Sequence, residues 1–412
     1  MQSDQGIAPE SLSDQMKKLI IQPLIKSAIS TVIVIDALDE CSEKDHASTI
    51  LSVLGQFVSQ IPKVKFFVTG RPHPRIRDGF RHPLLARMTD VFALHEVESS
   101  QIDSDIRLFL KQSLLELDRH RGGLDGWPAV EQLDILCKRA ARLFAYAVAT
   151  VKFVDCGDNS PKEQLARLLR QPMDTTYEGE TEFKSGTTLD LLYISILQEA
   201  FYGDDPEGDS KTRSVLGALV LAADPLSPST IAALLDISRD DVFRRLSSVH
   251  SLLILEDADS PARPFHTSFP DFITNPARCV DKRFYISPLN HHPEILAGCL
   301  KLMNQTLKEN MCNLPDAVAN SEVGDLHERT ERYLDPALRY ACTSWHKHPP
   351  NEHAARTPVI PSAVHYFLEN KFLFWLEVLS VLGAAREAVD ALEVTTKWLE
   401  VCRIYAVMSY QG

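Results

Sequence analysis

The sequence predicts an α/β domain followed by mostly helical domains. Two apolar runs near its start, residues 31–35 and 64–68, each pass directly into polar residues. Between them, apolar side chains recur at the i, i+3, i+4 and i+7 spacing of one helix face: Ala47, Ile50, Leu51, Leu54, Phe57, Val58 and Ile61. From residue 101 onward, helical periodicity dominates. We therefore expect a strand–helix–strand unit with a parallel crossover first, and helices after it.

The first strand ends in a cluster of carboxylates. The run Thr31–Ile35 is rich in β-branched residues and apolar on both faces, which suits a strand buried inside a parallel sheet. Asp36, Asp39 and Glu40 follow it. Open α/β sheets bind ligands at the carboxyl ends of their strands, and clustered carboxylates repel one another unless a cation such as Mg²⁺ neutralises them. The alternative is a buried strand followed by a solvated acidic turn.

The second strand ends close to Arg71. Parallel strands bring their carboxyl ends to one edge of the sheet, so we expect Arg71 near Asp36, Asp39 and Glu40. The planar guanidinium group of arginine pairs with phosphate oxygens bidentately. The sequence thus predicts an edge with a metal-binding side and a phosphate-binding side.

The two segments IDALDEC and FFVTGRP resemble the Walker B and sensor-1 segments of NACHT-type STAND NTPases. They are most similar to those of fungal NOD-like receptors and the nephrocystin-3-like P-loop group. The resemblance implies that residues 1–100 are the C-terminal part of a P-loop NTPase parallel sheet. It further implies that Asp36 helps to hold the Mg²⁺ of bound ATP. Asp39 and Glu40 would position or activate water, and Arg71 would sense the terminal phosphate.

The phosphate-binding loop of that family is absent from the sequence. NTPases of this class need a GxxxxGK[ST] loop whose backbone N–H groups and lysine hold the phosphates. The 412 residues contain no Gly-Lys dipeptide. We therefore expect the chain to begin inside the NTPase domain, as a fragment or mispredicted gene product, or to have lost the loop. ATP or ADP and Mg²⁺ would belong to the intact protein, and this chain would bind them weakly or not at all and be inactive as an ATPase.

After the sheet, the pattern predicts one more strand over residues 91–94 and then a helical region, residues 101–160. Its first helix is expected to be capped at Asp103 or Ser104. This region resembles the helical lid of the family. Residues 155–186 are rich in Gly, Pro, Asp and Thr, and predict a domain boundary.

Residues 187–275 predict a winged-helix domain. Short helices are expected at 215–221, 228–235 and 239–249, with strands at 252–255 and 264–266, and an acidic loop at 203–209 before them. A winged helix alone suggests DNA binding, with Arg239, Arg244 and Arg245 as groove contacts. The neighbouring acidic residues favour instead the intramolecular clamp for which the family uses this fold.

Two residues of this domain match nucleotide contacts of the family. Pro225 lies where NACHT proteins carry a proline that packs on the adenine. His266 is placed like the winged-helix histidine that reaches the ADP β-phosphate in related receptors. A histidine N–H can donate to a phosphate oxygen and lose that contact on rearrangement. The alternative is a histidine hydrogen-bonded within its own domain.

Residues 284–412 predict a helical domain that, in the family, leads to a repeat region not visible here. Cys342, His346 and His348 lack the paired ligands of a structural zinc site, which argues against a metal centre. A net charge of −13 argues against a DNA or RNA partner. No apolar run is long enough for a membrane span, and eight scattered cysteines without a CxxC pair favour the cytoplasm.

These features predict part of a NACHT-type signal-transduction ATPase, a nucleotide-dependent switch resembling an innate-immunity or self/non-self receptor of a fungus. Its partners would be other protein chains, as a self-oligomer or an effector. The alternative is a nucleotide-independent helical interaction module that has lost NTPase activity.

Overall fold

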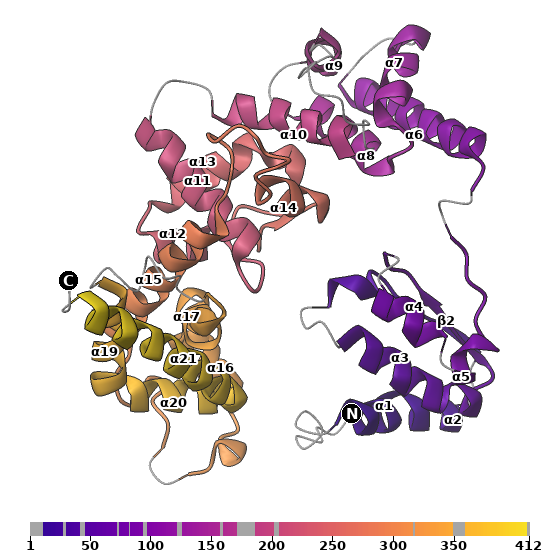
Figure 1. Cartoon of the computed structure of the whole chain (residues 1–412). Helices are drawn as coiled ribbons and strands as arrows, with labels where there is room; N and C mark the ends of the chain where they lie inside the picture. Colours follow the sequence, from indigo (N-terminus) through magenta and orange to yellow (C-terminus); the bar gives the residue numbers. More distant parts are fainter. Residues whose placement is uncertain are drawn as a thin grey trace. The chain divides into compact units, whose positions relative to one another are not determined.

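The chain divides into two compact units between Val97 and Glu98. The computed structural model (Figure 1) describes residues 11–27, 30–41, 46–71, 74–81, 83–93, 97–121, 126–156, 160–170, 186–201, 206–315, 318–348 and 359–409.

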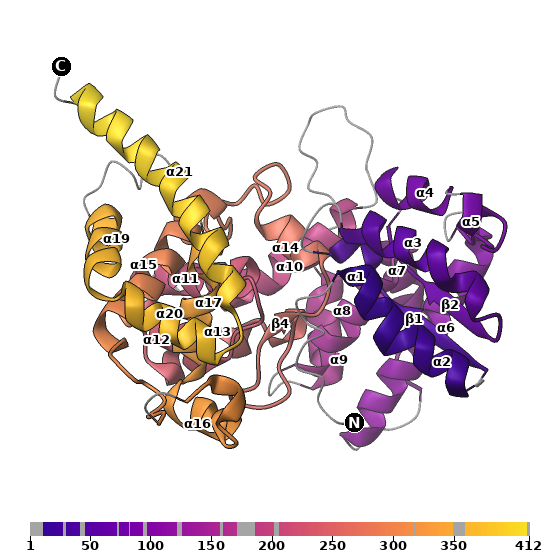
Figure 2. The same ribbon diagram turned by 90° about the horizontal axis from the view of Figure 1, so that it is seen from below.

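The first unit is built around a two-stranded parallel sheet. Strand β1 (Thr31–Ile35) pairs with β2 (Val64–Val68), and α3 (His46–Phe57) connects them, so the predicted strand–helix–strand unit is confirmed. Ahead of β1 lie α1 (Leu12–Met16), a π-helical turn (Lys17–Ile21) and α2 (Gln22–Ser27). The other elements of the unit are the 3₁₀ turns Leu38–Glu40 and Val58–Gln60, α4 (Pro74–Phe80) and α5 (Pro83–Ala86). Figure 2 shows α1, α2 and α3 beside the sheet.

The sheet is covered on one face. Ile33, Ile35, Phe66 and Val68 pack into the two apolar clusters of the unit, to which α3, the N-terminal helical segment, α4 and α5 contribute. The side chains of the other face are open: Val32 is 58% exposed, Val34 63% and Phe67 60%. The prediction of a strand buried on both faces is therefore wrong within the described residues, because only one helical layer packs on this sheet.

The strand predicted over residues 91–94 is not formed. Val91, Phe92 and Ala93 are irregular, Val91 and Phe92 are strongly exposed, and Leu94 lies outside the described residues. Residues with high β-propensity favour a strand because their side chains pack well on a half-buried sheet. Without a neighbouring strand, these residues therefore do not form one.

The second unit begins with α6 (Ser99–His120), α7 (Val130–Ala140) and α8 (Phe144–Asp155), which cover the predicted lid, residues 101–160. Helices α9 (Pro161–Arg170) and α10 (Gly186–Ala200) follow it, and α10 falls in the segment predicted as the winged-helix domain. Helix α6 starts four residues before the expected cap at Asp103, with Glu98 as its N-cap. Helix α9 lies inside the predicted boundary 155–186, of which residues 171–185 fall outside the described residues. Ser160 and Glu163 cap α9 reciprocally, and Arg139 of α7 donates to the carbonyls of Leu168 and Leu169.

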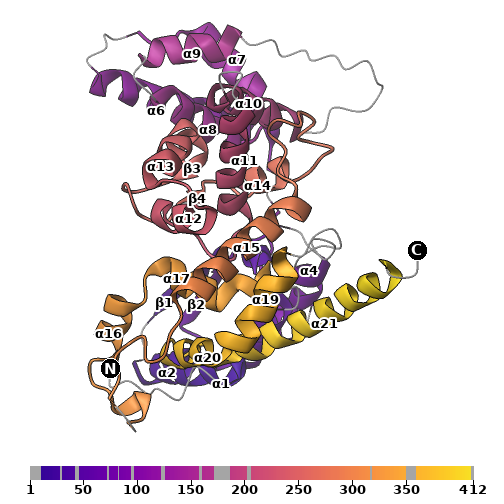
Figure 3. The same cartoon turned by 90° about the vertical axis from the view of Figure 1, so that its left-hand side faces the viewer.

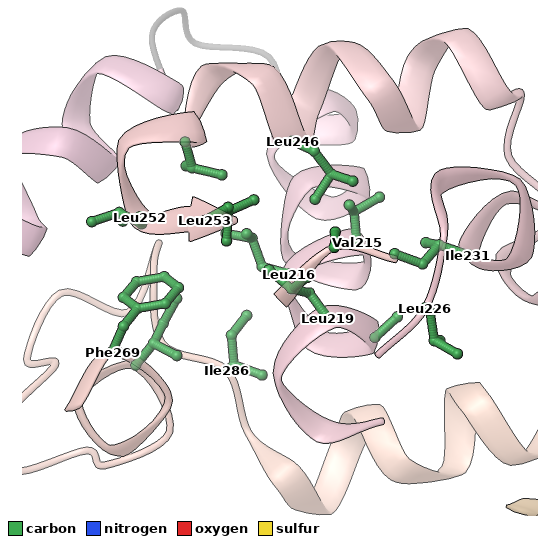
Figure 4. Packing of buried hydrophobic residues seen from close by; sticks show 14 of the residues in the cluster. Val215, Leu216, Leu219, Leu226, Ile231, Leu246, Leu252, Leu253, Phe269 and Ile286 are labelled. Atoms are coloured by element: carbon green, nitrogen blue, oxygen red, sulfur yellow. The ribbon is translucent and has the colours of Figure 1, made fainter. Parts of the chain in front are cut away.

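The elements predicted for the winged helix follow in the expected order. They are α11 (Pro206–Leu221), α12 (Pro228–Leu235), α13 (Arg239–Ser248), β3 (Leu253–Ile254) and β4 (Arg263–Pro264). The 3₁₀ turn His250–Leu252 and α14 (Ser268–Ile273) are also present and were not predicted. Strands β3 and β4 pair antiparallel, and Figure 3 shows them among the helices. Helix α11 includes Pro206–Asp209, which were expected to be part of an acidic loop. Acidic side chains in the first turn of a helix interact favourably with its dipole, so they stabilise this helix start. Figure 4 shows the shared core, where Val215, Leu246, Leu253 and Phe269 converge from four elements.

The C-terminal helices pack on α15 (Pro288–Thr306), which contacts α11 and α12 as well as α17 (Pro336–Ser344) and α19 (Val359–Asn370). The other elements are the 3₁₀ turns Asn320–Glu322 and Trp345–Lys347 (η7), α16 (Leu326–Tyr333), α20 (Phe372–Val381) and α21 (Ala385–Ser409). Among the helices that the structure describes, none combines the length and apolar composition of a bilayer-spanning segment.

Helices α12 and α15 approach each other closely at Gly298. A Cβ added there would lie 2.0 Å from the carbonyl oxygen of Leu234. Only a glycine fits this approach, because the obstacle is backbone and cannot rotate away.

We expect Gly298→Ala to destabilise the second unit by about 3 kcal/mol or more, since the two helices must separate to admit the methyl group. Chemical denaturation followed by tryptophan fluorescence measures this, because all four tryptophans (Trp127, Trp345, Trp375 and Trp398) lie in that unit. Gly324→Ala is the matched control, since a Cβ there meets no atom within 4 Å. Equal stabilities of the two variants would contradict the close approach.

Candidate functional site

The carboxyl ends of β1 and β2 bring Asp36 against Thr69. The parallel register pairs Ile35 with Val68, so Asp36 and Thr69 are the next residues on each strand. The Thr69 hydroxyl donates to Asp36 Oδ1 and accepts from the N–H of Ala37 at 2.9 Å. Asp36 is exposed, and its carboxylate is thereby oriented at the edge of the sheet.

The turn after β1 is held in a left-handed conformation. Ala37 has φ 51° and ψ 48°, which is uncommon for a residue with a Cβ, and the 3₁₀ turn Leu38–Glu40 follows it. The N–H of Leu38 donates to the Thr69 carbonyl at 2.9 Å, and the Leu38 side chain is buried in the core of the unit. This anchoring turns the acidic segment back over the end of β2.

Asp39 and Arg71 form the second contact of the edge. The N–H of Arg71 donates to Asp39 Oδ1 at 2.9 Å, and its Nε lies 3.4 Å from Asp39 Oδ2. A Cβ at Gly70 would lie 3.3 Å from Asp39 Oδ1, so this approach favours a residue without a side chain. The Asp39 side chain is 12% exposed and that of Arg71 is 55% exposed, so the guanidinium remains accessible to a ligand.

The edge thus gathers Asp36, Asp39, Glu40 and Arg71, as the sequence predicts, with Glu40 exposed. The carboxylates are compensated by the Thr69 hydroxyl and by Arg71 rather than left to repel one another. An exposed Asp36 with one oxygen fixed by a hydroxyl suits Mg²⁺, which keeps several waters and takes one or two carboxylates together with substrate phosphates.

Thr69 was not identified as a site residue from the sequence. The signal was available, because a parallel pairing of the two runs places the first residue after one strand beside the first residue after the other. Only the exact register decides that this neighbour of Asp36 is Thr69 rather than Gly70.

Pro225 and His266 lie in the second unit. Pro225 is exposed in the turn between α11 and α12, and the next residue, Leu226, bridges to Ala262 just before β4. That bridge joins the Pro225 turn to the strand that leads to His266.

The His266 ring has a defined proton arrangement. Its Nδ1 accepts from the N–H of Ser268 at 3.1 Å and lies 2.6 Å from Ser268 Oγ, which in turn lies 2.7 Å from the hydroxyl of Tyr193. Since a backbone N–H is always the donor, neutral His266 carries its proton on Nε2. His266 is therefore hydrogen-bonded within its own domain through Nδ1, as one of the two interpretations of the sequence expects. Its Nε2–H is a hydrogen-bond donor.

The residue two positions before Pro225 is held by a buried hydrogen-bond chain. The N–H of Ala223 donates to the Tyr340 hydroxyl at 3.1 Å, which lies 2.7 Å from His348 Nε2. His348 Nδ1 lies 2.9 Å from His292 Nδ1. The Tyr340 hydroxyl accepts from Ala223, and one proton is shared in each of the Tyr340–His348 and His348–His292 contacts, in the direction that the histidine tautomers set.

The arginines considered as DNA contacts and the residues considered as metal ligands have other partners or no matching arrangement. Arg239 pairs with Asp259 at 3.6 Å, Arg244 pairs with Asp241, and Arg245 binds Asp241 and the Gly208 carbonyl. Across the described residues, no group of three or more His, Cys, Asp or Glu side chains is arranged to hold a metal ion. Cys342 is buried, and burial raises the pKa of its thiol.

Residues 1–71 match the family model described as Nephrocystin 3, N-terminal. This confirms the nephrocystin-3-like resemblance for that segment, which contains β1, β2 and the whole edge from Asp36 to Arg71. No curated protein and no solved structure matches the chain.

We expect acid to weaken the second unit through His348. Burial, with His292 next in effect, lowers the pKa of His348 from 6.5 to about 3. Below pH 6.5 the unfolded state therefore binds a proton that the folded state does not. The contribution of His348 to the free energy of unfolding is complete above pH 6.5 and is lost as the pH falls toward 3. Between about pH 7.5 and about pH 5 this amounts to about 2 kcal/mol.

Denaturant midpoints at the two pH values measure the effect, and His348→Gln should reduce the pH dependence because an amide does not titrate there. His365→Gln is the matched control, since His365 is exposed on α19. An unchanged pH dependence in His348→Gln would contradict this assignment.

Proposed function

We propose that this chain is part of a NACHT-type nucleotide-dependent switch, to which the first unit contributes the metal and phosphate-sensing edge. The observation that carries the proposal is the paired arrangement at the strand ends, Thr69 with Asp36 and Arg71 with Asp39. It lies within the segment that matches the nephrocystin 3 N-terminal family.

In this proposal each group of the edge has one task. A bound nucleotide would supply the phosphates and, with its Mg²⁺, the positive charge that stabilises them, and Asp36 would be the residue that holds the ion. Thr69 holds Asp36 so that its carboxylate faces the cation. Arg71 exchanges Asp39 for the terminal phosphate, because a dianionic phosphate competes well for a guanidinium that is more than half exposed. Asp39, once released, and Glu40 would position or deprotonate the water whose oxygen attacks the terminal phosphate, with ADP as the leaving group.

The second unit would act as the reader of the nucleotide state. Lys152 of the lid helix α8 donates to the carbonyl of Leu253 in the wing at 3.2 Å. Arg278, which follows α14, pairs bidentately with Asp190 of α10. His266 would donate from Nε2 to the ADP β-phosphate, and Pro225 would pack on the base. A ligand that favours one conformation of these parts shifts the population between closed and open states.

A second candidate function is that of a nucleotide-independent interaction module. For both candidate functions we propose a cytoplasmic location. The apolar side chains of Val32, Val34 and Phe67 on the open face of the sheet favour it, since such surfaces tend to be covered by protein. The partners in both cases are other protein chains, as a self-oligomer or an effector. Binding of DNA or RNA is disfavoured by the net charge of −13 and by the carboxylates that pair with Arg239, Arg244 and Arg245.

We expect this chain to bind fluorescent ADP and ATP weakly or not at all, with no saturation up to about 1 mM nucleotide in the presence of Mg²⁺. The physical reason is the missing Gly-Lys loop, without which neither backbone N–H groups nor a lysine hold the phosphates. Fluorescence anisotropy measures it. Micromolar binding would contradict our account of the chain, although not the family resemblance of the edge.

Sequencing the transcript upstream of the Met1 codon tests the switch itself. An in-frame GxxxxGK[ST] segment favours the switch, and a genuine start at Met1 favours the interaction module. In a protein that carries the loop, we expect Thr69→Val to lower Mg²⁺-dependent ATP affinity roughly ten- to hundredfold, as for other residues that orient a metal ligand. Arg71→Ala should weaken ATP but spare ADP. Normal ATP–Mg²⁺ binding and hydrolysis by Asp36→Ala would refute the assignment of the edge.

A further inference from the structure

A small cavity lies inside the C-terminal helices. It has a volume of about 10 Å³ and is enclosed by residues from α15, α19, η7 and α21, with His348 at one side: Leu296, Trp345, His346, His348, Val364, Val394, Thr395 and Trp398. A space of this size holds one water molecule.

Three of the residues around this cavity carry a buried polar atom without a partner. They are Nε1 of Trp345, Nδ1 of His346 and Nε1 of Trp398. The three side chains are more than nine-tenths buried, with 4%, 7% and 8% of their surface exposed. An unsatisfied buried polar group costs about 1–3 kcal/mol, so three of them around one space call for a common partner.

The donor and acceptor roles of the three atoms follow from chemistry. Both indole nitrogens are donors only. His346 Nε2 lies 3.3 Å from Glu387 Oε2, and burial lowers the pKa of His346, so the ring is neutral and carries its one proton on Nε2, facing the carboxylate. Its Nδ1 is then an acceptor. Two donors and one acceptor match a single water, which accepts two hydrogen bonds and donates a third.

We propose that this cavity is a binding site for one water molecule, which accepts from Trp345 and Trp398 and donates to His346 Nδ1. The water joins α21, which carries Trp398, to η7, which carries the other two partners. Together with the Glu387–His346 contact it forms the polar part of the seam along which α21 docks. The apolar part is a narrow stripe of buried side chains on α21: Ala388, Ala391 and Trp398.

The chain provides its own control for this site. The fully buried indole of Trp375 donates to the Cys342 carbonyl at 2.8 Å, so its N–H has a protein partner. The experiment is NMR of the full chain labelled with ¹⁵N in tryptophan and histidine, with indole signals assigned by single Trp→Phe substitutions. Water–indole cross-relaxation reports a bound, long-lived water.

We expect cross-relaxation with water at the indoles of Trp345 and Trp398 and none at Trp375. The His346 ring should show Nδ1 unprotonated and Nε2 protonated. In Trp398→Phe the signal at Trp345 should weaken several-fold, because the water has lost one of three partners. If that variant does not fold, the unsubstituted protein decides. A dry cavity, a signal at only one of the two indoles, or the opposite His346 tautomer would overturn the proposal.

Discussion

The parallel pairing of β1 with β2 is the constraint on which the candidate site depends. With Ile35 opposite Val68, the residues that leave the two strands are Asp36 and Thr69, and the following turns place Asp39 beside Arg71. Burial of Leu38 fixes that turn from the core side. Because side chains alternate along a strand, a slip of one residue would turn the apolar face outward and separate both pairs.

The second unit depends on buried polar groups that connect segments far apart in the sequence. Arg139 reaches the end of α9, Tyr340 holds Ala223 while it bonds His348, and Trp375 bonds the carbonyl of Cys342. Each of these groups costs free energy when it is buried without a partner. Such contacts therefore favour one alignment of the helices over the many that apolar packing alone tolerates.

Elements with a strong period were predicted well, and those that depend on their surroundings were not. Helices α12 and α13 were expected within a residue of where they lie, since capping serines and apolar spacing mark them locally. Helix α9 was not predicted, because the residues around it are typical of turns, although Ser160 and Glu163 form a capping box that marks its start. The strand expected near Val91 failed for the opposite reason, because high β-propensity there has no strand beside it.

The sequence by itself determined the strand–helix–strand unit, the strongly periodic helices and the residues that stand at the ends of the two strands. Apolar spacing and cap chemistry are local properties, so a single sequence reveals them. The tertiary structure alone decided three hydrogen bonds: Thr69 to Asp36, the N–H of Arg71 to Asp39, and the N–H of Ser268 to Nδ1 of His266. The physical reason is that a polar atom takes the partner that strand register and helix packing bring within reach, and neither is written in the local pattern.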